Sequence, residues 1–363
     1  MLALILPMNS GTEILKEEAL VLLQQLIAIP SFSKEEDRTA NCINTFLIQK
    51  GITTNCIGNN VFAQNKHFDK AKPTILLNSH HDTVRPNPGY TKNPYQPVIE
   101  DGKLFGLGSN DAGGALVSLI AAFCHFYDHA DLKYNLIIAA TAEEETSGSG
   151  GVEAILPHLP TIDCAIVGEP TGMQLAVAER GLMVLDCIAT GRSGHAARSE
   201  GDNALYRALS DIQWIKEHKF PEVSPLLGPV KMSVTVIETG NKAHNVVPDV
   251  CTFVVDVRVN EMYSLEEALE TIQSSIQSNA TARSLRLRSS VIEQDHPLVQ
   301  AGMKLGRECY GSPTTSDKAL MPFPALKMGP GDSARSHTAD EFIYLHQIEH
   351  GIDLYVQLLN QLL

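Results

Sequence analysis

Short and almost wholly apolar runs recur along the first half of the chain, and each ends directly in polar residues. The three clearest runs are TILLNSHHD, NLIIAATAEEE and DCAIVGEPT. Runs of this length without alternation are typical of strands buried on both faces of a parallel sheet. Apolar residues at helical spacing predict helices at 12–28, 38–50 and 112–128. We therefore expect an α/β domain with a mixed, mostly parallel sheet flanked by helices.

After about residue 180 the strands begin to alternate apolar and polar residues. The segments LMVLDCIATG, KMSVTVIETG, CTFVVDVRVN and SLRLRSSV predict four such strands. Helices at 203–218 and 264–278 lie between them, which gives the order β-α-β-β-α-β. Alternating strands suit a sheet that leaves one face exposed. This region is therefore expected to form a small α+β unit of ferredoxin-like topology.

The pattern of the first region returns near the C-terminus. HPLVQAGMKLG predicts a helix, PALKMGPG a strand, and 340–362 a closing helix. A chain of 363 residues also exceeds the usual size of one compact core. We expect one discontinuous domain, 1–179 and 293–363, interrupted by an inserted domain at 180–292.

Composition and charge exclude several function classes. The net charge of −14 argues against nucleic acid as a partner, because phosphate binding needs a basic face. No window approaches the ~20 apolar residues of a membrane helix. The opening MLALILPMNSG is too short, and lacks the basic flank, for a signal peptide, so we expect a short N-terminal extension. Seven cysteines without a C-x-x-C pair fit the reduced thiols of a cytoplasmic protein.

His80 and Asp82 end the first apolar run. A neutral imidazole is the commonest zinc ligand, and a carboxylate often fixes its tautomer and orientation. Alternate strand residues share a face, so an H-x-D triplet offers both groups on one side. Taken alone, the triplet is explained equally well by a surface loop.

Asp111 stands among glycines at the start of a predicted helix, in the segment GLGSNDAGG. Aspartate is a favoured N-cap residue, and that interpretation stays open. The glycines would also let the backbone crowd an ion, and the two oxygens of a carboxylate can bridge two metals. Asp111 is therefore a candidate ligand.

Acidic residues follow the other two apolar runs: Glu143, Glu144 and Glu145 after the second, and Glu169 after the third. Consecutive acids usually mark a solvated face. At a buried strand end their charges would repel and raise their pKa values unless cations neutralise them. Two zinc ions would supply that neutralisation, with one glutamate ligating and its neighbour holding a water.

His337 lies in the loop GPGDSARSHTADEF, just before the predicted closing helix. A lone loop histidine is most often only a surface residue, so its significance depends on the other motifs. In this order, H-x-D, a Gly-rich segment with Asp, T-A-x-E-E, G-E-P-T and a late G-P-G…H-x-x-D-E resemble the dinuclear zinc deacylases and aminoacylases of the peptidase M20 family. The resemblance covers nearly the whole chain and implies that the inserted domain is a dimerisation lid.

The resemblance also implies roles for individual residues. The ligands would be His80 and Glu169 for one zinc, Glu145 and His337 for the other, and Asp111 between the two. Glu144 would be the general base, and Asp82 would support His80. His195 in GRSGHAA would reach across a dimer to the substrate carbonyl. The further substrate-binding candidates are Asn245, Arg258, Arg180 and Lys318.

The implied reaction is hydrolysis of the amide bond of an N-acyl amino acid. N-Acetylornithine, or an acylcitrulline, is the first expectation, and succinyl-diaminopimelate or a di- or tripeptide is the alternative. A metal-binding homologue without activity is the remote alternative, since the chain keeps the base Glu144. Leu107 and the Asp-Ala-Gly-Gly sequence depart from the family's usual Gly-Arg-Gly and Asp-Met-Lys-Gly, which leaves the exact substrate open.

The expected cofactors are two zinc ions per subunit. Cobalt or manganese could replace them, because carboxylate-rich sites accept several divalent ions. The expected partners are a small-molecule substrate and a second copy of the chain, and the expected location is the cytoplasm.

Overall fold

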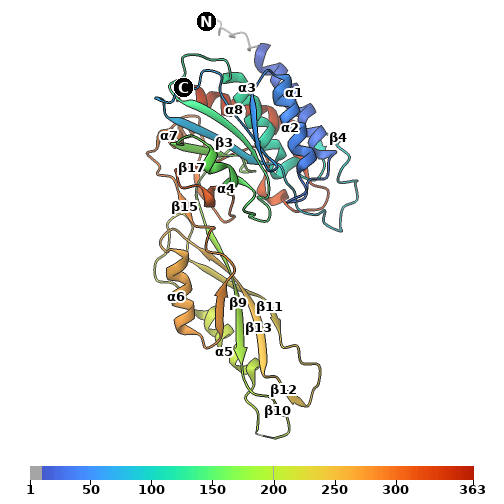
Figure 1. The fold of residues 1–363 in the computed structure, drawn as a ribbon, viewed down its shortest axis with the longest axis vertical. Helices are drawn as coiled ribbons and strands as arrows, with labels where there is room; N and C mark the ends of the chain where they lie inside the picture. The colour runs from blue at the N-terminus through green and yellow to red at the C-terminus, as the bar shows by residue number, and fades with distance from the viewer. Residues whose placement is uncertain (1–9, 199) are drawn as a thin grey trace, which may run out of the picture. The chain divides into compact units, whose positions relative to one another are not determined.

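The computed structural model describes residues 10–198 and 200–363 (Figure 1). The prediction of an N-terminal extension concerns mainly residues 1–9, which lie outside the described residues. The described chain forms two compact units, of which the first runs to Val177 and includes Ile292–Tyr310 and Ser316–Leu363. The second comprises Ala178–Val291 and Gly311–Thr315. The predicted domain boundaries and the lid role remain predictions.

Within the described residues, the first unit is built on a nine-stranded mixed sheet. Its centre consists of β6 (Asn135–Thr141), β3 (Thr74–His80), β7 (Cys164–Val167) and β17 (Ala325–Lys327), which pair in parallel. Every residue of these four strands is buried, which explains why their sequences are mostly apolar without alternation. The flanking strands are β1 (Thr54–Ile57), β2 (Asn60–Gln64), β8 (Leu175–Glu179) and β16 (Cys309–Ser312). The ninth strand, β15 (Ser290–Val291), pairs with the last residues of β8 and is counted with the second unit. The predicted fold class is confirmed.

Helices cover both faces of this sheet (Figure 1). On one face α3 (Gly114–Phe126) lies against β3 and β6, and packs against α1 (Ser10–Ile27) and α8 (Leu345–Asn360). Nearly every side chain of α3 is buried, as expected for a helix that is apolar all round. On the other face α4 (Val152–Ile155) joins an apolar cluster around Leu76. The remaining helices of this unit are α2 (Asp37–Gln49) and α7 (Pro297–Lys304).

The predicted closing helix at 340–362 is partly wrong. Its first residues form β18 (Phe342–Tyr344), which pairs antiparallel with β5 (Lys103–Phe105), and β5 pairs with β4 (Val98–Glu100). Aromatic and β-branched residues favour a strand here, and the rings of Phe105 and Phe342 lie 5.4 Å apart. The helix α8 therefore begins only at Leu345.

The second unit has the predicted β-α-β-β-α-β order. Its elements are β9 (Gly181–Thr190), α5 (Ala204–Glu217), β11 (Lys231–Glu238), β13 (Val250–Val259), α6 (Leu265–Ser275) and β14 (Asn279–Ala282). As far as the structure describes it, the sheet has the antiparallel order β11-β13-β9-β14, and both helices pack on one side of it (Figure 1). Alternate residues of β9 and β13 are buried under the helices, among them Leu185 and Val255. A separate two-stranded antiparallel pair joins β10 (Gly194–His195) to β12 (Val246–Val247).

The fourth strand of this unit is not the one that the sequence predicts. We expected SLRLRSSV at 284–291, but β14 pairs with β9 instead and buries Ala280 opposite Cys187. Helix α6 ends at Ser275, earlier than expected, so the chain enters the sheet earlier as well. The later segment contributes only β15.

None of the described helices is long and apolar enough to cross a membrane. All seven cysteines of the chain are free thiols.

Candidate metal centre

The carboxyl ends of the central parallel strands bring the predicted polar residues together. His80 is the last residue of β3, Glu144 and Glu145 follow β6, and Glu169 follows β7. Because β3 pairs in parallel with both β6 and β7, these ends meet at one edge of the sheet. The polar residues that directly follow the apolar runs in the sequence therefore converge at one end of the parallel strands.

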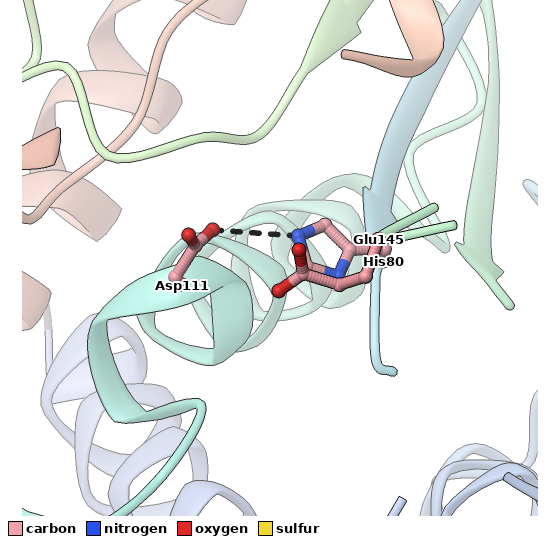
Figure 2. Close-up of side chains that lie close together, drawn as sticks. All are labelled: His80, Asp111 and Glu145. Carbon is pink, nitrogen blue, oxygen red and sulfur yellow. Dashed lines mark ion pairs between the residues drawn. The ribbon is translucent and has the colours of Figure 1, made fainter. Parts of the chain in front are cut away.

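His80 lies at the centre of this cluster. Its Nε2 is 3.5 Å from Oδ1 of Asp111, 3.7 Å from Oε1 of Glu169 and 3.9 Å from Oε2 of Glu144. Figure 2 shows the Asp111 carboxylate pointing toward the His80 ring, with the dashed line marking their ion pair. The residue is 1% exposed, and Nε2 has no hydrogen-bond partner among the described residues. A buried ring nitrogen facing several carboxylates fits a shared cation.

His337 forms the second half of the cluster. Its Nε2 lies 3.0 Å from Oε2 of Glu145 and 3.6 Å from Oδ2 of Asp111. Asp111 therefore directs one oxygen toward His80 and the other toward His337. The donor atoms of His80, Asp111 and Glu145 all lie within 4.8 Å of one another, as do those of His80, Glu144 and Glu169. Either group could hold a metal, although not both at once, because they share the one lone pair on Nε2 of His80.

The tautomer of His80 suits a metal ligand. Its Nδ1 lies 3.0 Å from the carbonyl oxygen of Asp82, which can only accept, so Nδ1 carries the proton and Nε2 keeps its lone pair. Burial opposes a second proton, but the carboxylates of Glu144, Asp111 and Asp82 outweigh it and raise the pKa of His80 in the absence of a cation. A proton on Nε2 and a metal would thus compete for the same position.

Asp82 joins several parts of the centre. Its carboxylate accepts hydrogen bonds from the backbone N–H groups of Glu144, at 3.0 Å, and Glu145, at 3.1 Å, and from the Ser33 hydroxyl, at 2.7 Å. Burial opposes ionisation of Asp82, but the His80 ring and the Ser33 hydroxyl hold its pKa below the usual value. Asp82 therefore holds the His80 ring through its backbone carbonyl, and holds the turn that carries both glutamates through its buried carboxylate.

The three consecutive acids have different environments. Glu143 has a positive φ of 55°, and its carboxylate accepts from the N–H of Gly150. A Cβ at Gly148 would lie 2.7 Å from Cβ of Glu143, so the glycine-rich loop closes tightly around this side chain. Glu144 and Glu145 lie at the metal centre instead. Burial, followed by the neighbouring carboxylates Glu169 and Asp317, raises the pKa of Glu144 well above its usual value.

The structure rejects the interpretation of Asp111 as a helix N-cap. Asp111 belongs to the segment Ser109–Gly113, where its φ and ψ of −118° and 99° are not helical. The N-cap of α3 is Gly113, and within the described chain no side chain caps this helix end.

The comparison with known protein families covers this whole cluster. Residues 76–361 match the family described as Peptidase family M20/M25/M40, a span that runs from before His80 to beyond His337. The chain belongs to this family.

The M20 chain resembles several succinyl-diaminopimelate desuccinylases. It is 27% identical over 367 residues to the enzyme of Corynebacterium glutamicum (strain ATCC 13032), covering 95% of this chain and 96% of the relative. It is 26% identical over 292 residues to that of Wolbachia pipientis subsp. Culex pipiens (strain wPip), covering 76% and 73%.

Solved structures share the fold. The M20 family metallo-carboxypeptidase Sso-CP2 from Sulfolobus solfataricus has a TM-score of 0.77 at 18% identity, covering 95% of this chain and 99% of that one. The Bacillus subtilis YXEP protein, described as a dinuclear metal binding peptidase from the M20 family, has a TM-score of 0.69 at 14% identity, covering 96% and 98%. Together with the family match, this identifies an M20 hydrolase fold with a candidate metal site.

Most of the predicted substrate-binding residues belong to the second unit. His195 is exposed on β10, and the carbonyl of Asn245 accepts from the N–H of Ala196. Arg258 forms a two-point ion pair with Asp256, at 2.8 and 3.0 Å. All these residues belong to the second unit, so the structure of the first unit does not test their roles.

The other two candidates are buried. Arg180 donates from Nη2 to the carbonyl of Leu227. Lys318, in the first unit, donates from Nζ to the carbonyl of Val177 at 3.1 Å and lies 3.4 Å from that of Ala176. Their roles in substrate binding remain predictions.

Two buried carboxylates near the centre were not expected from the sequence. Asp317 accepts from Nδ2 of Asn78 and the hydroxyl of Thr141, both at 2.8 Å, and burial raises its pKa to about 6. Glu341 accepts from backbone N–H groups around Asp111, and burial with the nearby Asp111 charge raises its pKa to about 8. For Glu341 the sequence offers one signal, since it is the last residue of the H-x-x-D-E motif that begins at His337.

Proposed function

We propose that this M20 chain is a two-metal amidohydrolase that removes a succinyl group from an N-succinyl amino acid. The observation that carries the reaction class is the shared carboxylate Asp111, which faces His80 on one side and His337 on the other. The acyl group rests on the curated relatives, which are succinyl-diaminopimelate desuccinylases. They favour this alternative over N-acetylornithine, the first expectation from the sequence.

The residues around the cluster divide into two donor sets. One set is His80 with Glu169, the other is Glu145 with His337, and Asp111 serves both. Zinc is the proposed metal, with cobalt or manganese as substitutes. When bound, two such ions polarise the scissile carbonyl and lower the pKa of a water.

Glu144 is the proposed general base. It lies beside the donor sets, with its Oε2 3.9 Å from Nε2 of His80. A carboxylate at this place can take a proton from water and then deliver it to the leaving nitrogen. Asp82 holds the backbone of Glu144 and the ring of His80, so it orients the base relative to the metals.

Residues of the second unit are proposed to bind the substrate. His195, which is exposed on β10, would stabilise the oxyanion. Arg258, supported by Asn245, would pair with a substrate carboxylate, since a guanidinium binds it at two points. Arg180 and Lys318 are further candidates, although their described donors already reach carbonyl groups.

A homodimer through the second unit is part of the proposal. Strand β11 lies at the edge of its sheet, and an unpaired edge is a template for a strand of another chain. On the neighbouring helix α5, Tyr206 and Leu209 are 68% and 48% exposed and one turn apart. A cytoplasmic location is also proposed, supported by the seven free thiols.

The test is a substrate panel with the zinc-loaded protein. It contains N-succinyl-diaminopimelate, N-succinylornithine, N-succinylcitrulline, their N-acetyl counterparts and a set of di- and tripeptides. The proposal predicts that kcat/KM is highest for a succinyl substrate. A preference for acetyl substrates restores the acetylornithine hypothesis, and a preference for peptides with a free amino terminus makes the chain a peptidase. Inactivity of the zinc-, cobalt- and manganese-loaded protein on the whole panel would support a non-catalytic homologue.

A further inference from the structure

Glu341 is buried beneath the loop that carries Asp111. It is 2% exposed, and no catalytic or ligand role has been assigned to it. Its Oε1 accepts from the N–H groups of Asn110, at 2.8 Å, and Asp111, at 2.9 Å, while its Oε2 accepts from that of Gly108, at 3.0 Å. Three backbone donors of one short segment therefore converge on a single carboxylate.

The side chain of Asn110 joins the same two segments from another direction. Its Oδ1 accepts from the N–H of Asp332 at 2.9 Å, and its Nδ2 donates to the carbonyl of Asp332 at 3.0 Å. A Cβ at Gly331, which has a φ of +100°, would lie 2.7 Å from this Oδ1, so glycine allows the close approach. Five hydrogen bonds thus connect the segments 108–111 and 332–341.

His337 lies within the second of these segments and Asp111 within the first. Their facing atoms, Nε2 and Oδ2, are 3.6 Å apart. The chain distance between them exceeds two hundred residues, so local structure cannot hold this spacing. The hydrogen bonds of Glu341 and Asn110 supply a direct mechanical link.

We propose that Glu341, together with Asn110, is a positioning residue that sets the orientation of Asp111 relative to His337 before any metal binds. The inference rests on the proposed two-metal site and extends it to residues that touch neither metal. Because Asp111 serves both donor sets, a change in its orientation affects the pair of metals more than either one alone. Residues that orient metal ligands typically contribute roughly 10- to 100-fold in metal affinity.

Asp340 provides a matched control. It is the adjacent carboxylate and also accepts three hydrogen bonds, from the N–H and hydroxyl of Thr91 and the N–H of Lys92. These bonds connect it to the segment 91–92 and not to 108–111. Glu341→Gln and Asp340→Asn therefore each replace one acceptor oxygen by an amide nitrogen, but only the first change disturbs the loop of Asp111.

In the experiment, metal-free wild-type, E341Q and D340N proteins are titrated with Mn²⁺. Calorimetry measures the number and affinity of the bound ions, and electron paramagnetic resonance measures their coupling. Wild type and D340N should bind two ions and show the signal of a spin-coupled pair. E341Q should bind its second ion roughly 10- to 100-fold more weakly and lose the coupled signal, with an unchanged circular dichroism spectrum. Wild-type affinity and coupling in E341Q would overturn the inference.

Failure of the two-metal site itself has a separate result, because the wild-type protein would then show no coupled pair. If E341Q does not fold, Asn110→Ala takes its place, since this change removes the two hydrogen bonds to Asp332 and leaves Glu341 intact. N110A should also weaken the second ion and lose the coupling. If N110A binds both ions with wild-type affinity and coupling, the inference is equally contradicted.

Discussion

The candidate metal centre of the first unit and the substrate-binding candidates of the second unit differ in how firmly each side chain is held. His80 and Asp82 are buried and joined to each other and to the turn that carries the glutamates. His195 and Asn245 are exposed at the strand pair β10–β12, and the charge of Arg258 is already paired with Asp256. The comparison teaches that the proposed groups for bond cleavage are held in place within one unit, whereas the residues proposed for recognition are exposed or already paired with other groups.

The largest expected effect comes from the proposed base. Glu144→Gln should lower kcat about 10²- to 10⁴-fold, because a general base contributes on that order. The metal content, measured by mass spectrometry, should stay near that of the wild type. Glu143→Gln is the matched control, since Glu143 lies in the glycine-rich loop and its variant should keep nearly full activity. Loss of a metal in E144Q would make Glu144 a ligand instead.

A smaller effect is expected in the second unit. His195→Ala should reduce kcat about 10²-fold, the order measured for a lost oxyanion donor, and should leave metal content and oligomeric state unchanged. His244→Ala, a change at an exposed histidine near β12, serves as the control and should have little effect. Steady-state kinetics on the preferred substrate decide the matter. A change confined to KM would assign His195 to substrate binding and would weaken the contrast between the two units.

The smallest expected effect is a change with pH in the stability of the metal-free protein. The hydrogen bond with Glu145 raises the pKa of His337 from 6.5 to about 9, and burial raises that of Glu341 from 4.5 to about 8. Both groups hold their proton more tightly in the folded chain, so this stability is present at low pH. The contribution of Glu341 to stability is lost as the pH rises from 4.5 to about 8. The contribution of His337 is lost as the pH rises from 6.5 to about 9.

Metal ions bind the deprotonated histidine, so the stabilisation they give should grow over the same range. Thermal denaturation of chelator-treated and zinc-loaded protein, from about pH 6 to about pH 9, measures both trends. The Tm of the metal-free protein should fall with rising pH, and the gap to the zinc-loaded protein should widen. A metal-free Tm that rises across this range would contradict the protonated state inferred for these two groups.

Several parts of the molecule follow from local sequence. The runs that end at His80, Glu144 and Glu169 are buried parallel strands, and the fold class is the expected one. The fourth strand of the second unit is a failure of the same reasoning. The alternating segment 284–291 has the period of a strand, yet 279–282 pairs with β9, because the end of α6 sets where the chain enters the sheet.

By itself the sequence determined that histidine and carboxylates stand at the ends of buried strands, because an apolar run and the residue that follows it are local properties. Tertiary structure alone decided that Glu143 turns into a glycine-rich loop while its two neighbours face the centre. It also decided that Glu341 supports the backbone of Asp111. These contacts join segments far apart in the chain, and their geometry depends on packing that no local pattern records.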